Sequence, residues 1–321
     1  MIFAPLSASP ANLWMSSWVR PARLACRTVP RRPSFPCPEL LRAPMRTCLR
    51  TMVAILFCLA AQPTVAFAQD HDGGGTPAIA TDHGRDERVF NLSLNEGERL
   101  SVLFATPASP RGTIVMLPGG AGDIGLGHDG RIRHGDNFVV RTRELWNRRG
   151  YAVLIPDTSD HANLRGHRAS SAYARVVGGL VALARQQGSG PVFLLGTSQG
   201  TIAAVNGAAH APAGSIAGVV LTESVSVMGG SRETVFSASP QDIGVPVLVV
   251  ANRDDRCNVA PPTAARQIAA AMTASRDVQV LMVAGGITRS KRECGSLTPH
   301  GYFGIEDQVI DAICNWLDTH A

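Results

Sequence analysis

The sequence predicts an α/β protein whose parallel sheet is covered by helices on both faces. From about residue 112 onward, short continuous apolar runs alternate with longer segments that have a helical period. Continuous apolar strands are typical of parallel sheets buried on both faces. The chain shows no internal repeat, and the roughly 250 residues after its leader fit one domain.

The elements begin with a predicted hairpin, in which Asn95-Glu96-Gly97 separates two strand-like runs. Strands and helices then alternate, until the polar stretch 223–242 takes the place of a crossover helix and becomes a candidate cap over a site. We expect strands at 89–94, 100–105, 112–118, 151–157, 191–196, 216–223, 245–251 and 278–284, and helices at 137–150, 167–188, from 198, 263–274 and about 304–319.

A secretory signal peptide is predicted before the domain. From Met45, two arginines precede an apolar run over 52–61, and small residues end it at Ala68, where cleavage is expected. An N-terminal membrane anchor is the alternative, but the run is short for a span and Pro63 interrupts it. Both Met1 and Met45 are possible starts. The expected location is the periplasm or the exterior of the cell.

The organisation that follows is a leader over 1–68, a disordered linker over 69–86 and one domain over 87–321. Eight of the 30 Lys and Arg residues precede residue 69, but only one of the 25 Asp and Glu residues does. The formal charge of +5 therefore comes from the leader, and the body is near neutral. This distribution argues against nucleic acid as a partner.

A candidate nucleophile lies at the end of a central strand. The segment Gly196-Thr197-Ser198-Gln199-Gly200 joins an apolar strand to a helix, which is the context of a nucleophile elbow. The two glycines keep side chains out of the narrow space between strand and helix. The alternative is a glycine-rich turn in which Ser198 only caps the helix.

An ordinary serine needs a base and an orienting acid. Asp254 and Asp255 both follow the strand 245–251; Asp255 is preferred as the acid because it lies farther along the loop, with Asp254 as runner-up. His300 is the predicted base, since it alone follows the acid in a short loop before the last helix. The other histidines lie before Ser198, in a helix-to-strand loop or at the terminus.

Cysteine usage fits export. Cys257 and Cys294 lie in the loops of the proposed acid and base, so we expect a disulfide between them that limits the motion of these loops. Cys314 lies in a helical pattern and is expected to be a buried free thiol. The remaining four cysteines belong to the leader: Cys26, Cys37, Cys48 and Cys58.

The oxyanion hole is predicted from two backbone N–H groups, those of Gln199 and Gly120, with Ala121 as runner-up for the second. The stretch from Gly120 to Gly125 also matches G-x-G-x-x-G, the pattern of a dinucleotide site, but no helix-forming run follows it. No cofactor is therefore expected. A metal site is also not expected, because the spacing of four candidates in a polar loop fits no template: His128, Asp129, His134 and Asp136.

The body from about residue 88 resembles the α/β-hydrolase superfamily, nearest its dienelactone-hydrolase-like and small-esterase branches. The resemblance rests on the segment 118–121, the elbow 196–200, the acid pair and Pro299-His300-Gly301. It implies an eight-stranded, mostly parallel sheet and a Ser-acid-His triad without a cofactor. Pro118 stands where many members carry His, and Gln199 replaces a common His or Tyr.

The expected function is cleavage of a carboxylic ester through an acyl-enzyme, with a small-molecule substrate. Peptide or amide cleavage on the same fold is an alternative, as is a non-catalytic binding protein on a hydrolase scaffold. A perhydrolase or lyase-like reaction would use the same triad. The basic run 289–294 beside the proposed site is read as a solvated face that can also attract an acidic substrate. Oligomeric state is not predicted.

Overall fold

The computed structural model describes residues 80–82, 85–94 and 98–321. The predicted leader and its signal peptide lie outside the described residues, as do most of the predicted linker and the hairpin turn 95–97. Within the described part of the chain, no helix is long and apolar enough to cross a membrane.

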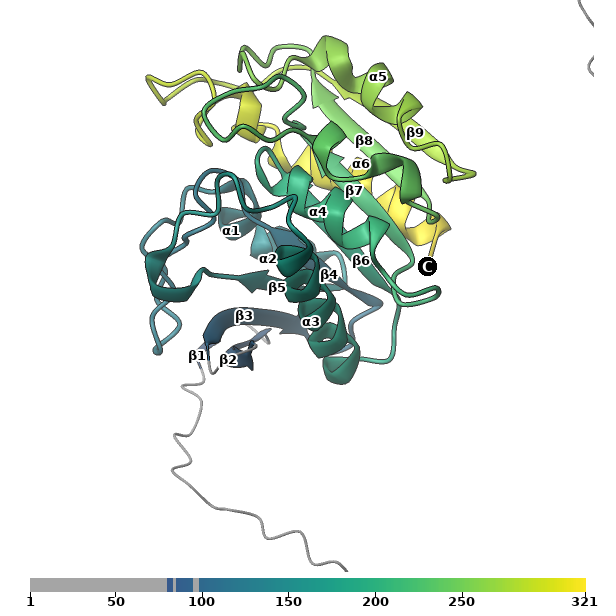
Figure 1. Ribbon diagram of the computed structural model, residues 1–321. Helices are drawn as coiled ribbons and strands as arrows, with labels where there is room; N and C mark the ends of the chain where they lie inside the picture. Colours follow the sequence, from purple (N-terminus) through teal and green to yellow (C-terminus); the bar gives the residue numbers. More distant parts are fainter. Residues whose placement is uncertain (1–79, 83–84, 95–97) are drawn as a thin grey trace, which may run out of the picture. The chain divides into compact units, whose positions relative to one another are not determined.

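The predicted mostly parallel sheet with helices on both faces is confirmed (Figure 1). The strand order is β1-β2-β3-β5-β4-β6-β7-β8-β9. The pairs from β5 to β9 along this order are parallel, whereas β1, β2 and β3 continue the sheet in antiparallel pairs. The strands are β1 Ala80–Asp82, β2 Arg85–Ser93, β3 Arg99–Pro107, β4 Gly112–Leu117, β5 Tyr151–Pro156, β6 Val192–Thr197, β7 Gly218–Thr222, β8 Val247–Asn252 and β9 Val278–Val283.

The sheet has nine strands, one more than the resemblance implied. The additional strand is β1, which pairs with β2 in the antiparallel register Ala80↔Glu87. It falls inside the segment 69–86 for which no order was expected. Backbone pairing with an edge strand needs no apolar side chains, which explains why a hydropathy pattern does not reveal it.

The central strands are buried on both faces, and successive side chains enter opposite cores. Val192 and Leu194 of β6 face the core under α3, α4 and α5, while Phe193 and Leu195 face the core with α1, α2 and α6. Figure 1 shows α3 and α4 in front of the sheet and the yellow helix α6 behind it. The helices are α1 Phe138–Arg141, α2 Arg143–Arg148, α3 Ser171–Gln187, α4 Gly200–Ala209, α5 Ala265–Ala270 and α6 Glu306–Thr319.

One predicted helix is divided in two. The segment 137–150 forms α1 and α2, which meet at Thr142 with φ −96° and ψ 0°. The Thr142 hydroxyl donates to the carbonyl of Phe138 at 2.6 Å and accepts from the indole N–H of Trp146 at 3.1 Å. A buried threonine that bonds back to a carbonyl one turn earlier is a known cause of a helix bend.

Candidate active site

Ser198 lies in a sharp turn between β6 and α4. Its φ is +51°, a left-handed conformation that is unfavourable for a residue with a side chain, and its N–H donates to the carbonyl of Thr222 at 2.9 Å. A Cβ on Gly196 would lie 2.4 Å from the carbonyl oxygen of Gly200, and one on Gly200 would lie 2.0 Å from that of Leu117. Only glycine fits at either position, so the turn has the strain and the close approach of a nucleophile elbow.

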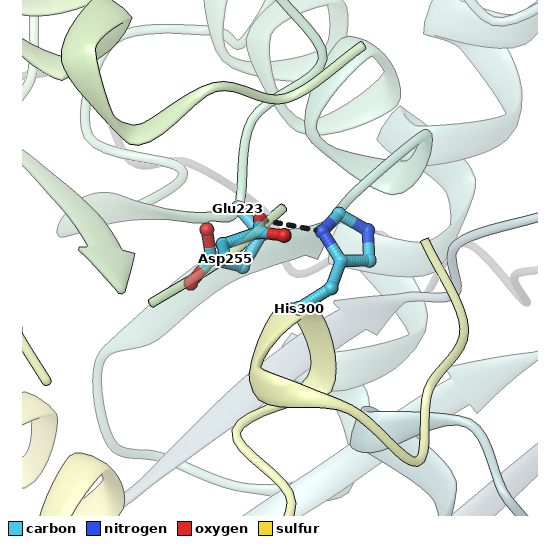
Figure 2. Close-up of side chains that lie close together, drawn as sticks. All are labelled: Glu223, Asp255 and His300. Atoms are coloured by element: carbon cyan, nitrogen blue, oxygen red, sulfur yellow. Dashed lines mark hydrogen bonds and ion pairs between the residues drawn. The ribbon is translucent and has the colours of Figure 1, made fainter. Parts of the chain in front are cut away.

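The structure brings Ser198, His300 and Asp255 together. His300 Nε2 lies 2.9 Å from Ser198 Oγ, and His300 Nδ1 lies 2.7 Å from Asp255 Oδ2. Figure 2 shows the carboxylate of Asp255 beside the His300 ring. An ionised carboxylate only accepts, so Nδ1 carries the proton and Nε2 is left to accept from the serine hydroxyl. The side chains of His300 and Asp255 are 4% and 0% exposed, so solvent does not compete for the bond between them.

Asp254, the runner-up acid, points elsewhere. Its Oδ2 accepts the N–H of Gly285 at 2.6 Å, in the loop that leaves β9. The remaining oxygen of Asp255, Oδ1, accepts the N–H of Cys257 at 2.7 Å. The structure thus places Asp255, and not its neighbour, against His300.

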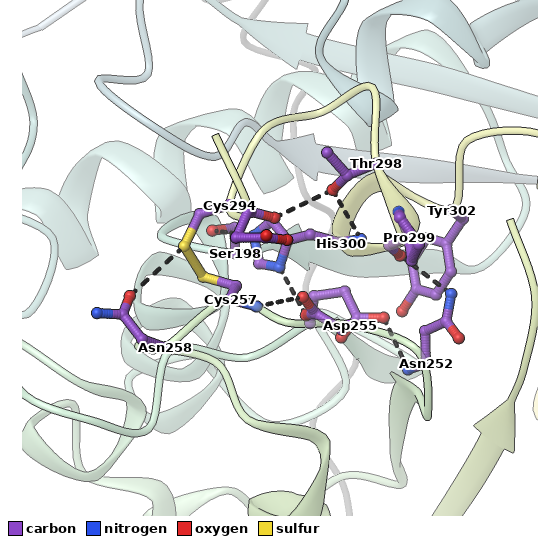
Figure 3. Close-up of polar contacts among 12 residues, drawn as sticks. Ser198, Asn252, Asp255, Cys257, Asn258, Cys294, Thr298, Pro299, His300 and Tyr302 are labelled. Atoms are coloured by element: carbon purple, nitrogen blue, oxygen red, sulfur yellow. Dashed lines mark hydrogen bonds and ion pairs between the residues drawn. A yellow bond between two sulfur atoms is a disulfide. The ribbon is translucent and has the colours of Figure 1, made fainter. Parts of the chain in front are cut away.

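The loops that carry the acid and the histidine are joined covalently by a disulfide between Cys257 and Cys294 (Figure 3). Asn252, at the end of β8, adds two further links, since its amide donates to the carbonyls of Gly285 at 2.9 Å and Pro299 at 3.1 Å. The hydroxyl of Thr298 accepts the N–H of His300 at 3.1 Å. These bonds fix the direction from which the imidazole approaches Ser198.

The loop after β4 passes beside the nucleophile. A Cβ built on Gly119 would lie 3.1 Å from Cβ of Ser198, and Gly120 adopts φ +61°. Among the described residues, no acceptor takes a hydrogen bond from the backbone N–H of Gly120, Ala121 or Gln199. Unpaired N–H groups beside a nucleophile can receive an oxyanion.

A wall next to the nucleophile comes from residues 223–242, the candidate cap. This stretch contains two 3-10 turns, Val235–Ser237 and Pro240–Asp242, and no α-helix. The amide of Gln199 donates to the hydroxyl of Ser231 at 3.2 Å. The buried carboxylate of Glu233 accepts three N–H groups of the loop after β5, at 3.0 to 3.3 Å, from Gly166, Arg168 and Ala169.

Two other motifs of the sequence, the G-x-G-x-x-G pattern and the polar loop after it, adopt their own local structures. No helix begins between the G-x-G-x-x-G pattern and Phe138, within the described residues. In the polar loop, His134 Nδ1 lies 3.0 Å from the carbonyl of Asp123, and Asp129 pairs with Arg131. Among described residues, the one cluster with metal-ligating types close together is Glu223, Asp255 and His300. The last two already bond each other, so a metal there would have to break that bond.

Glu223 is the site residue that the sequence reasoning missed. It follows β7 directly, as Asp255 follows β8 after a short turn, but the sequence interpretation placed it at the end of the strand 216–223 and the start of the candidate cap without a role in the site. The available signal was an acidic residue at the end of β7, the strand next to the one that precedes Asp255. Reading it required knowledge that β7 and β8 are neighbours in the sheet.

Comparisons with known proteins define the fold. No protein-family model and no curated protein matches the chain. A dienelactone hydrolase from Anabaena variabilis is similar, with 17% identity, a TM-score of 0.54 and coverage of 74% of this chain and 99% of that one. An esterase from Pyrococcus furiosus has 12% identity and a TM-score of 0.54, with coverage of 78% of this chain and 99% of that one. Est1E from Butyrivibrio proteoclasticus with ferulic acid bound has 14% identity and a TM-score of 0.51, with coverage of 72% of this chain and 98% of that one.

At these identities the likeness is one of fold. The chain has the α/β-hydrolase fold, and the predicted resemblance to dienelactone hydrolase and esterase structures is confirmed at that level. The same fold carries many reactions, so the chemistry has to be argued from the site.

Proposed function

We propose that this protein is a serine hydrolase that cleaves carboxylic esters, with Ser198 as nucleophile, His300 as general base and Asp255 as orienting acid. The observation that carries the proposal is the continuous chain of contacts, 2.9 Å from Ser198 Oγ to His300 Nε2 and 2.7 Å from His300 Nδ1 to Asp255 Oδ2. The strained elbow supports the same reading, as do the three N–H groups beside it that have no acceptor among the described residues.

In the first half of the reaction, Ser198 Oγ forms a bond to the acyl carbon while its proton passes to His300 Nε2. The N–H groups of Gln199 and of Gly120 or Ala121 receive the oxyanion, a contribution of about 3–4 kcal/mol per donor. The bond to the alcohol then breaks, and His300 returns the proton to the leaving oxygen. In the second half, water repeats these steps and releases the acid and free Ser198.

Ester substrates are favoured by the fold likeness, because two of the structures with TM-scores above 0.5 are named as a dienelactone hydrolase and an esterase. Est1E holds ferulic acid, so esters of aromatic acids belong among the substrates to be tested. We also propose export, which is supported by the predicted signal peptide and by a disulfide that an oxidising compartment preserves.

The test is a fluorophosphonate probe together with a panel of p-nitrophenyl esters, feruloyl esters and aminoacyl anilides. Wild type is expected to be labelled at Ser198 and to turn over esters, and Ser198→Ala is expected to do neither. Turnover of anilides in preference to esters would make the protein an amidase. An unlabelled wild type that turns over none of these compounds would leave a binding protein on a hydrolase scaffold.

A further inference from the structure

A second buried carboxyl lies beside the proposed triad. Glu223 follows β7, is 1% exposed and adopts φ +48°, so the chain holds a charged residue type in an unfavourable conformation inside the molecule. Because β7 and β8 are parallel neighbours, their carboxyl ends bring Glu223 and Asp255 together. One ligand atom each of Glu223, Asp255 and His300 lies within 4.8 Å of the others, and Figure 2 shows the two carboxyls next to each other.

The contacts of Glu223 satisfy only half of its carboxyl group. Oε1 accepts the backbone N–H of Asn252 at 2.8 Å. Oε2 is buried and, among the described residues, receives no hydrogen bond. If Glu223 were ionised, one of its oxygens would be buried without a hydrogen-bond donor and would lie next to the negative charge of Asp255. Both conditions are unfavourable.

A proton on Glu223 removes both conditions, because a neutral carboxyl is a donor. Asp255 can accept, since each oxygen of a carboxylate has two acceptor sites and each has one protein partner here: Cys257 N–H on Oδ1 and His300 Nδ1 on Oδ2. We propose that Glu223 is protonated in the folded protein and donates a hydrogen bond to Asp255, and that it thereby positions the carboxylate that orients His300. This inference rests on the proposed function for its catalytic meaning.

The electrostatic surroundings agree with this assignment. Burial raises the pKa of Glu223 well above its usual range and the negative charge of Asp255 raises it further, while the nearby Tyr302 hydroxyl and the N–H of Asn252 lower it by less. The other titratable neighbours of Glu223 are His300 and Tyr302. The Tyr302 hydroxyl donates to the carbonyl of Val250 at 3.2 Å, and its pKa is raised well above the usual value, first by burial and then by the nearby Glu223. With Glu223 and Tyr302 both neutral, Asp255 is the one negative charge paired with His300 within the described part of the chain.

Protonation can be tested without any substrate. The Glu223 pKa is raised on folding from about 4.3 in the unfolded chain, so the folded protein binds the extra proton between the two values. The stability contributed by that proton is complete below the unfolded pKa and is lost as pH rises towards the folded pKa. Glu223→Gln has no such proton. The unfolding free energy of Glu223→Gln minus that of wild type is therefore expected to increase steadily as the pH rises from 5.

The measurement is urea unfolding of wild type and Glu223→Gln between pH 5 and pH 9. A difference between the two proteins that stays constant over this range, or that moves in favour of wild type with rising pH, overturns the protonated assignment. This result does not depend on catalysis. A protein that hydrolyses no ester would refute the proposed function and still give a clear answer about the proton on Glu223.

The positioning role is tested by comparing Glu223→Gln with Glu223→Leu in a pH profile of kcat/KM. Gln keeps an N–H donor for Asp255 and is expected to retain most of the activity, whereas Leu is expected to lose about 10- to 100-fold in kcat with little change in KM. In Glu223→Leu no donor from position 223 shares the charge of Asp255, so Asp255 stabilises the protonated form of His300 more strongly. The acidic limb of the kcat/KM profile of this variant is therefore expected at higher pH. Equal losses and an unshifted limb for both folded variants would reduce Glu223 to a packing residue.

Discussion

Carboxylates bond backbone N–H groups on both sides of Ser198, but among the described residues only the side of β8 also carries a disulfide. On the side of β8, a disulfide and the amide of Asn252 join the acid and histidine loops. On the side of β4 and β5, carboxylates hold the backbone. Asp157 accepts the N–H groups of Ile124 at 2.8 Å and Leu126 at 2.6 Å, and Glu233 accepts three more.

This difference separates two ways of making a rigid site. A covalent link acts mainly on the unfolded chain, which it restricts, and it is insensitive to charge. A buried carboxylate that accepts several N–H bonds acts on the folded state, and its strength depends on its ionisation. The β8 side, which carries His300, is therefore expected to respond to reductant as well as to changes of charge, whereas the β4 and β5 side is expected to respond to changes of charge alone.

The largest loss of activity is expected on the β8 side, when the acid Asp255 is changed. Asp255→Asn keeps the shape of the side chain but replaces an acceptor by a donor, which favours the wrong tautomer of His300. The expected loss in kcat on a p-nitrophenyl ester is about 10³- to 10⁴-fold. Asp254→Asn is the matched control, since Asp254 bonds Gly285, and its activity should stay within about threefold of wild type. Equal losses in both variants would contradict the choice of Asp255.

The disulfide is expected to have the next largest effect. Its two cysteines are 37 residues apart, and a loop of this length corresponds to about 4 kcal/mol of unfolding free energy in the chain-entropy description. The double variant Cys257→Ser, Cys294→Ser should lose about this amount in urea unfolding, and treatment of wild type with dithiothreitol should reproduce the loss. A variant as stable as wild type would show that Asn252 and the loop packing suffice to join the two loops.

The carboxylate on the other side should contribute less. Glu233→Gln preserves the shape but removes the charge that three N–H groups share, at a cost of about 1.5–3 kcal/mol. The exposed Asp242→Asn, in the same stretch of chain, is the control. If the two sides are independent, the losses of Glu233→Gln and of the disulfide variant will add in the combined variant. A clear departure from additivity would mean that the two sides form one cooperative unit.

The comparison also explains what the sequence could predict. The elbow is readable because its constraints are local, with two glycines and a serine between a strand and a helix. The acid, the base and the pairing of Cys257 with Cys294 follow from chain order along a known kind of sheet. Glu223 was missed because its meaning depends on the adjacency of β7 and β8. The division of α1 from α2 depends on one side chain bonding its own backbone, and β1 depends on backbone pairing, and neither leaves a periodic pattern.

The smallest effect is expected at the third cysteine of the body, which serves as the control for the disulfide. Cys314 is a buried free thiol in α6, and burial raises its pKa to about 12. A thiol that is both buried and protonated reacts slowly, so iodoacetamide at pH 8 should leave Cys314 unmodified in the folded protein and alkylate it after unfolding in urea. Cys314→Ala should cost about 1 kcal/mol, because only one sulfur atom leaves a packed core. Rapid alkylation of Cys314 in the native protein, located by peptide mass, would instead show that α6 opens readily. The loss of stability in the Cys257 and Cys294 variant could then no longer be ascribed to the site loops alone.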